Sequence, residues 1–247
     1  MLKIANSFII FFVIASGSFL FLGCSDSSEK NIQKEQISSE KSDQVVEIVE
    51  ESLEVKKEVS QTAKYKIEFV ADWSAKTHPD FYPKNAHFSP FVAYSHNDSG
   101  QAKIFTKGEL ATAGVEDMAE TGATEILVKE IKSLTSSKLV YQQTKGKVFD
   151  SPGNDFSELS FSQDYSGFLF VSMLAPSPDW FVSGSTDLFQ DGDWVERVEL
   201  DLVTFDAGTD DGVELTSGDK DSNPKQLIEI FGDELQGLGR VVLSRVE

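Results

Sequence analysis

Apolar and polar residues alternate in the chain from residue 65 onward, which is typical of strands with one buried face. Residues 65–71 are the clearest case, and a second strand is predicted over residues 88–94. Later apolar runs are spaced like the strands of a β-sandwich. They cover residues 138–142, 159–161, 168–174, 195–205, 226–231 and 239–246.

Helical spacing is found mainly in residues 110–122, which end at Gly122, a typical helix stop. Five apolar residues are expected to share the buried face of this helix: Leu110, Ala113, Val115, Met118 and Ala119. Residues 125–134 fit either a second short helix or a strand. The predicted fold is therefore mainly β, an antiparallel β-sandwich with one or two short helices.

The amino-terminal 23 residues have the pattern of an export signal, with Lys3 followed by an apolar run over residues 8–22. The run ends at Leu22-Gly23-Cys24, which resembles the lipobox of bacterial lipoproteins, although Phe21 departs from its usual leucine. This resemblance implies cleavage before Cys24 and acylation of that residue, which would hold the protein on a membrane. An uncleaved membrane anchor and ordinary secretion are the alternatives. Ser25 favours sorting to the outer membrane of a Gram-negative cell envelope.

Residues 24–63 differ sharply from the rest of the chain, because they are rich in Ser, Glu, Lys and Gln and contain no aromatic residue, glycine or proline after Cys24. Such a segment cannot bury enough apolar surface to fold alone. We therefore expect three parts: a signal peptide over residues 1–23, a disordered acidic tether beginning at the acylated Cys24, and a folded domain over residues 64–247.

The 247-residue chain is strongly acidic, with a formal net charge of −19. This charge argues against nucleic acid as a partner, because phosphates require Lys and Arg. It suits a divalent cation or a basic partner, and it also suits plain solubility. Cys24 is the single cysteine, so no disulfide can form within the chain.

Two loop-forming stretches carry the candidate chemistry. Residues 175–181 follow an apolar run that Pro176 must end, which should leave Asp179 and Trp180 on a rigid loop. Residues 206–212 follow another run and place Asp206 and Asp210 on either side of a glycine turn. Carboxylates gathered at strand ends repel one another unless a cation lies between them, and a hard divalent cation is the natural candidate. The alternative is that these aspartates only form turns.

The same stretches resemble the spondin domain family, together with Trp73-Ser74, His78-Pro79, Tyr82-Pro83, residues 111–115 and residues 119–122. The resemblance covers residues 65–230 and implies a β-sandwich that binds calcium through Asp179, Asp206 and Asp210. Asp211 is a further candidate ligand. Ser160 stands where some members carry a glutamate ligand, and Phe189 stands where a cysteine is expected. Trp180 and Phe181 either pack inside the loop or form an exposed patch that contacts a ligand.

Other chemistries have weaker support. His78, His87 and His96 are spaced by nine residues and lack neighbouring cysteines or clustered acids, so a zinc site is not predicted. Residues 219–230 begin like an EF-hand loop but have Pro224 and Ile230 where that loop needs Gly and Glu. No nucleophile elbow or phosphate-binding loop is present, so an enzyme is not expected. The family's matrix and receptor contacts imply a non-enzymatic module that binds a protein or glycan, and an envelope structural protein is the alternative.

Overall fold

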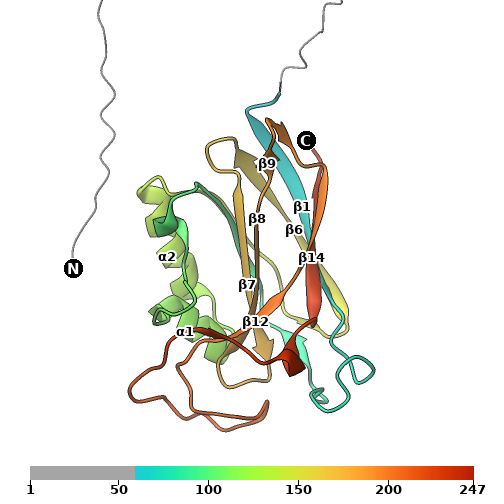
Figure 1. The fold of residues 1–247 in the computed structure, drawn as a ribbon, viewed down its shortest axis with the longest axis vertical. Helices are drawn as coiled ribbons and strands as arrows, with labels where there is room; N and C mark the ends of the chain where they lie inside the picture. Colours follow the sequence, from blue (N-terminus) through green and yellow to red (C-terminus); the bar gives the residue numbers. More distant parts are fainter. Residues whose placement is uncertain (1–58) are drawn as a thin grey trace, which may run out of the picture. The chain divides into compact units, whose positions relative to one another are not determined.

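The computed structural model describes residues 59–247 (Figure 1). The expected signal peptide, Cys24 and the tether up to residue 58 lie outside the described residues. The strands that form the first sheet are β1 (Thr62–Ala71), β6 (Gly153–Ser162), β11 (Arg197–Asp201) and β14 (Gly239–Arg245). The strands of the second sheet are β2 (His87–Phe88), β3 (Val92–His96), β4 (Val140–Lys145), β5 (Phe149–Asp150), β7 (Gly167–Ala175), β8 (Trp180–Asp187), β12 (Val203–Asp206) and β13 (Glu229–Ile230).

Four helical segments and one small hairpin complete the described part. They are the α-helices α1 (Ala113–Thr121) and α2 (Glu125–Ser136), the 3-10 helices η1 (Gly100–Ala102) and η2 (Asp233–Leu235), and the paired strands β9 (Phe189–Gln190) and β10 (Asp193–Trp194). The mainly β fold with two α-helices confirms the predicted class.

The first sheet has the order β11-β14-β1-β6, with antiparallel pairing throughout. β1 lies between two long partners and alternates buried and half-buried residues, as its sequence pattern predicts. It begins at Thr62, two residues before the expected start of the domain. Its inward side chains meet the second sheet and form the main core.

The second sheet has the order β13-β12-β8-β7, and β7 then pairs with both β3 and β2. The single strand predicted over residues 88–94 is wrong, because Ser89, Pro90 and Phe91 separate β2 from β3. Pro90 cannot donate to a ladder. The single strand predicted over residues 195–205 is wrong in the same way: β11 belongs to the first sheet and β12 to the second, and Leu202 lies between them.

β8 was not predicted as a strand. It begins at Trp180, which we expected on a loop, and it pairs with β7 from Phe181 to Asp187. Val182 points into the core between the sheets, whereas Phe181 belongs to the core on the other face of the second sheet. The strand therefore begins with Trp180 and Val182 on one face and Phe181 on the other, and continues with small or polar residues. A run of three apolar residues followed by polar ones does not show the alternation that predicts a strand.

The core between the sheets is strongly aromatic. Phe69 on β1 is fully buried and meets Phe88, Phe149 and Phe170 with ring centroids 4.8, 5.0 and 5.0 Å away. All three contacts are edge-on, the geometry that aromatic quadrupoles favour. One phenylalanine of β1 thus connects β1 with strands of the opposite sheet.

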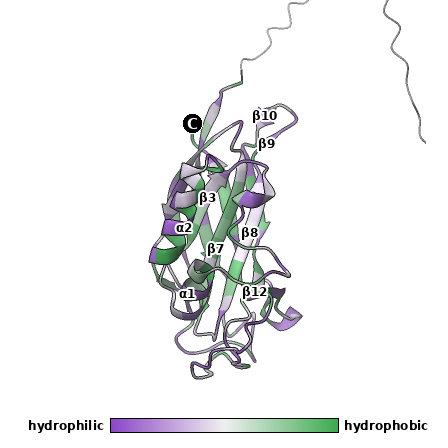
Figure 2. Cartoon of the chain, turned by 90° about the vertical axis from the view of Figure 1, so that its left-hand side faces the viewer, coloured by the Kyte–Doolittle hydropathy of each residue, from purple (hydrophilic) through white to green (hydrophobic). Residues whose placement is uncertain are grey.

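A second core lies between the outer face of the second sheet and the helices, and Figure 2 shows apolar residues along β3 and β7 on this side. α1 begins after Thr112, whose Oγ1 accepts a hydrogen bond from the Val115 N–H at 3.2 Å, and it ends at Gly122 with φ of 74°. Leu110 lies before the helix, and both Leu110 and Ala113 are exposed, so their placement on the buried face is wrong. Residues 125–134, which fitted helix or strand, lie within α2.

The strand registers place the start of the domain and the acidic loops at opposite ends of the sandwich. Thr62 of β1 pairs with Ser162, whereas Ala71 pairs with Gly153 and Gly239. A strand of ten residues spans about 30 Å. The loops that follow β7 and β12 are at the Ala71 end, visible at the bottom of Figure 1. No helix within residues 59–247 has the length and apolar character needed to cross a membrane.

Candidate metal centre

The loop between β7 and β8 turns Asp179 into the protein. β7 ends at Ala175, directly before Pro176, as the sequence predicts. Ser177 then stabilises a tight turn, because its Oγ accepts from the Trp180 N–H at 3.1 Å and donates to the Leu174 carbonyl at 2.5 Å. Asp179 is consequently held at the base of the neighbouring loop, which follows β12.

Asp179 is fully buried, and its two carboxylate oxygens differ in their surroundings. Oδ2 accepts three hydrogen bonds: from the backbone N–H groups of Thr209 at 2.6 Å and Asp210 at 3.1 Å, and from the Thr209 hydroxyl at 3.2 Å. Oδ1 has no hydrogen-bond partner within the described residues. Burial raises the pKa of Asp179 to about 6, and the charge of Asp206 contributes to the same shift. A buried carboxylate with one unsatisfied oxygen is costly unless something pairs with it.

Asp206 lies beside Asp179 at the end of β12, where it pairs in register with Trp180. Its Oδ1 accepts the Gly208 N–H at 2.8 Å, and Gly208 has φ of 72°. A Cβ at Gly208 would lie 2.6 Å from the Gln226 carbonyl, so this turn requires glycine. Burial raises the pKa of Asp206, whereas the Gly208 N–H and the nearby Trp180 indole lower it. The indole nitrogen does not reach hydrogen-bond geometry with any group in the described residues.

Asp210 is buried next to this pair, but both of its oxygens are engaged. Oδ1 accepts the Gly212 N–H and Oδ2 accepts the Lys220 N–H, each at 2.6 Å. Asp211 points elsewhere: its Oδ1 accepts from the Ser222 hydroxyl at 2.6 Å, and its Oδ2 forms an ion pair with Lys220 at 3.2 Å. The Ser222 and Lys220 contacts lower the pKa of Asp211.

The structure thus brings Asp179 and Asp206 together, places Asp210 next to them and turns Asp211 away. In the part of the chain that is described, no group of three His, Cys, Asp or Glu side chains already has the spacing of a closed metal site. The open Oδ1 of Asp179 beside the Asp206 carboxylate is nevertheless a hard oxygen donor set, of the kind that calcium prefers. Closing the site requires Asp210 to turn toward the pair, or backbone carbonyls and water to complete the ligand set.

Glu120, in the last turn of α1, is a neighbouring acid that the sequence reasoning missed. Its Oε1 is buried without a partner, and the residue shares a cavity of about 280 Å³ with Asp210 and Asp219. Burial raises the pKa of Glu120, and the Thr209 side chain lowers it. The only sequence signal was its position two residues before the predicted helix stop at Gly122. It adds negative charge next to the loop that carries Asp206 and Asp210.

The remaining sequence candidates lie in other surroundings. Trp180 and Phe181 are 2% and 0% exposed, which favours the packing alternative over an exposed patch. Ser160 lies on β6 of the first sheet, opposite Lys64. The three histidines contact backbone carbonyls: His78 that of Gln236, His87 that of Asn85 and His96 that of Asn97.

The fold and the site define the class of this protein: a two-sheet β-sandwich with a helical layer and acidic loops at one end. The chain belongs to the spondin N-terminal domain family, because the Spondin_N family model matches residues 63–234. Spondin-1 of Homo sapiens is 34% identical over 207 residues, covering 75% of this chain and 25% of that protein. Spondin-1 of Xenopus laevis is 35% identical over 206 residues, with the same coverage. Spondin-2 of Rattus norvegicus is 35% identical over 176 residues, covering 67% of this chain and 52% of that protein.

This chain therefore spans about a quarter of the length of Spondin-1 and about half of that of Spondin-2. The family match confirms the resemblance inferred from residues 65–230.

Proposed function

We propose that the domain binds calcium through Asp179, Asp206 and Asp210, and that it serves as a non-enzymatic binding module. The single observation that carries the calcium proposal is the Asp179 carboxylate, which is fully buried with an unpaired Oδ1 next to the half-buried carboxylate of Asp206. A divalent cation relieves both the repulsion between the two charges and the unsatisfied oxygen. Asp211 and Glu120 are the nearest acids that could join the ligand set.

The geometry of the loop fits this assignment. Three donors hold Oδ2 of Asp179 and leave Oδ1 free, so the carboxylate is oriented before any ligand arrives. Gly208 brings Asp206 and Asp210 close together on one short turn. Preorganised oxygen donors bind a cation without a large cost of ordering the loop.

Adding calcium is expected to stabilise the protein by about 2.7 kcal/mol at a hundredfold excess over Kd, since binding to the folded state alone shifts the unfolding equilibrium. For a domain of this size the melting temperature should rise by roughly 5–10 °C. Differential scanning fluorimetry of the full chain, with EGTA or calcium, measures the shift. Asp206→Asn should abolish it, and Asp150→Asn, which replaces an exposed acid on β5, should leave it intact. The calcium assignment fails if the Asp206→Asn protein responds to calcium as the wild-type protein does.

We further propose that the protein is a cell-surface lipoprotein of the cell envelope, held at the outer membrane through acylated Cys24. Support comes from the sequence of residues 1–24 and from the position of the acidic loops at the end of the sandwich that lies opposite Thr62. The chain enters the sandwich at Thr62, at the end opposite those loops. The exposed loops are then available to a protein or glycan ligand, for which calcium would offer open coordination positions.

Growth with an alkyne-tagged palmitate is expected to label the wild-type protein, because acylation of Cys24 places fatty chains on it. Cys24→Ser should remove the label and release the protein from the membrane fraction. Gel fluorescence after click chemistry measures the first effect, and fractionation measures the second. An unlabelled wild-type protein would rule out the lipid anchor.

A glycan and matrix-protein array, probed with and without calcium, distinguishes a ligand-binding function from a purely structural one. Calcium-dependent binding that Asp206→Asn removes supports a ligand-binding module. Stabilisation by calcium without any array signal favours an envelope structural protein.

A further inference from the structure

The outer edge of β8 is only half covered. β12 pairs with β8 only over Trp180 to Ser183, because its first residue, Val203, lies opposite Ser183. On the other side of β8, pairing with β7 continues to Asp187. β11, the segment before β12, belongs to the first sheet, so the chain leaves the β8 edge at Leu202. The second half of β8 therefore has a strand neighbour on one side only, within the part of the chain that is described.

Hydrogen bonds show which main-chain groups point to that open side. The Thr204 N–H donates to Gln236 at 3.0 Å and the Thr204 carbonyl accepts from the Phe231 N–H at 2.9 Å, so Thr204 faces away from β8. Its neighbour Val203 then faces β8 and meets Ser183. Ser185 lies two residues further along β8 and points the same way. Among residues 59–247, no main-chain group pairs with the N–H and carbonyl of Ser185 across this edge.

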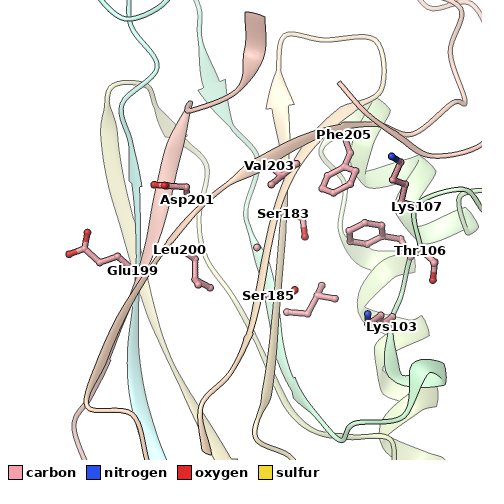
Figure 3. A pocket seen from close by; sticks show the side chains of 13 residues that line it. Lys103, Thr106, Lys107, Ser183, Ser185, Glu199, Leu200, Asp201, Val203 and Phe205 are labelled. Carbon is pink, nitrogen blue, oxygen red and sulfur yellow. The ribbon is translucent and has the colours of Figure 1, made fainter. Parts of the chain in front are cut away.

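A groove of about 580 Å³ lies along this edge (Figure 3). Ser183, Gly184 and Ser185 of β8 form its floor. Gly184 adds no side chain to this floor, and a Cβ there would lie within 3.1 Å of the Leu202 side chain. The segment before α1 forms one wall and carries Lys103 and Lys107, and the β11 side carries Leu200, as Figure 3 shows.

The charges of the two walls differ. On the helix side, Lys103 has no ion pair in the described chain and Lys107 has only an exposed one, with Glu229 at 3.4 Å. On the β11 side, Glu199 is neutralised by Arg197 at 2.7 Å and by Arg240 at 3.6 Å. The helix-side wall is consequently basic, which is unusual in a chain with a net charge of −19. Asp201 is the one acid in the opposite wall without such a pair.

We propose that this groove binds an extended, acidic polypeptide segment that adds to β8 in the line of β12. The Ser185 N–H and carbonyl anchor its main chain, as in other cases of strand addition to a free sheet edge. Successive side chains of a strand point to opposite faces. Carboxylates at alternate positions then reach Lys103 and Lys107, and the positions between them pack against Leu200. This site is separate from the acidic loops and needs no calcium.

The proposal is tested with a fluorescent pentapeptide, acetyl-Val-Glu-Val-Glu-Val-amide, titrated into the full chain in EGTA and followed by anisotropy. Saturable binding is expected. Ser185→Pro should weaken it about tenfold, the worth of one to two lost hydrogen bonds. Proline is tolerated here because the Ser185 N–H faces away from the β7 ladder. Lys103→Gln should weaken binding about threefold, and Thr186→Ala, on a residue whose main chain faces β7, should change it less than twofold.

Hydrogen exchange of the Ser185 amide in the wild-type protein gives a second measurement that requires no variant, and the peptide should slow it. The proposal is overturned if the wild-type protein shows no saturable binding. It is also overturned if Ser185→Pro leaves the affinity for the peptide unchanged and the peptide leaves the exchange rate of the Ser185 amide unchanged. Binding of a sulfated oligosaccharide that Lys103→Gln abolishes and Ser185→Pro leaves unchanged would assign the groove to a glycan instead.

Discussion

Replacing Asp179 by asparagine is expected to raise the stability of the calcium-free protein at pH 7 by on the order of 3 kcal/mol, because it removes a buried charge whose proton is lost near pH 6. Asparagine retains an oxygen for the Thr209 and Asp210 N–H groups. Its amide can donate to the neighbouring Asp206 carboxylate. The structural role of the side chain is therefore preserved while its charge is removed.

The pH dependence follows from the direction of the shift. The pKa of Asp179 is raised in the folded state to about 6, from an ordinary value of 3.8. Between pH 4 and 6 the folded protein retains a proton that the unfolded chain has released, so the stability of the wild-type protein falls as the pH rises through this window. Above pH 6 both states have released the proton, and this fall in stability is complete. The stability of Asp179→Asn should not show this fall between pH 4 and 6.

Urea unfolding in EGTA at pH 4, 5, 6 and 7 measures the difference between the two proteins. Calcium at a thousandfold excess over Kd stabilises the protein that binds it by about 4.1 kcal/mol. It should therefore reverse their order at pH 7, because only the wild-type protein has the charge that calcium binds. Asp150→Asn serves as a control for the loss of one negative charge from the surface. A wild-type protein that is more stable than Asp179→Asn in EGTA at pH 7 would contradict the burial of an ionised Asp179.

Phe69→Ala is expected to destabilise the domain by about 3–5 kcal/mol, the usual cost of removing a buried phenylalanine. The cost should lie at the upper end, because three other rings contact Phe69 edge-on and each contact is worth up to about 1.5 kcal/mol beyond buried area. Phe69→Leu should cost less, since it leaves a smaller cavity.

Phe156→Ala is the matched control for Phe69→Ala. Phe156 lies on the neighbouring strand β6 but is 64% exposed, and its main contact is Lys66, whose Nζ lies 5.3 Å from the ring centroid. Its removal should cost about 1 kcal/mol or less. Urea midpoints of the three variants measure these costs. Equal losses for Phe69→Ala and Phe156→Ala would show that the aromatic core is not where the stability of the sandwich resides.

The sequence predicted the elements whose buried residues recur with a regular period. It missed the strands that are defined by the strands they pair with. β1 alternates along its length because one face is covered by the opposite sheet. β8 has no such period, because the positions after Val182 are small or polar. Residues 195–205 look continuous in sequence, yet Leu202 separates a strand of one sheet from a strand of the other. Strand partners decide both cases, and they are distant in sequence.

The acidic loops were located from sequence because prolines and glycines marked their turns, and the family resemblance selected Asp179, Asp206 and Asp210. The sequence did not reveal that Asp179 would be fully buried with one free oxygen. It also gave no reason to select Glu120, which approaches the loop only because α1 packs against the second sheet. The groove beside Ser185 could not be predicted from the sequence either, since it exists because β12 does not extend past Val203 to pair with Ser185.

The opposite placement of Thr62 and the acidic loops has a mechanical consequence. A pull between these two points would run along the length of the sandwich and would reach the domain first through β1. β1 pairs with β6 from Thr62 to Ala71 and with β14 from Tyr65 to Ala71. Such a load shears both ladders at once, so the hydrogen bonds must yield together, whereas a load across the strands would open them one at a time. The same register that separates the two ends therefore makes the domain stiff in the direction in which a bound partner would strain it.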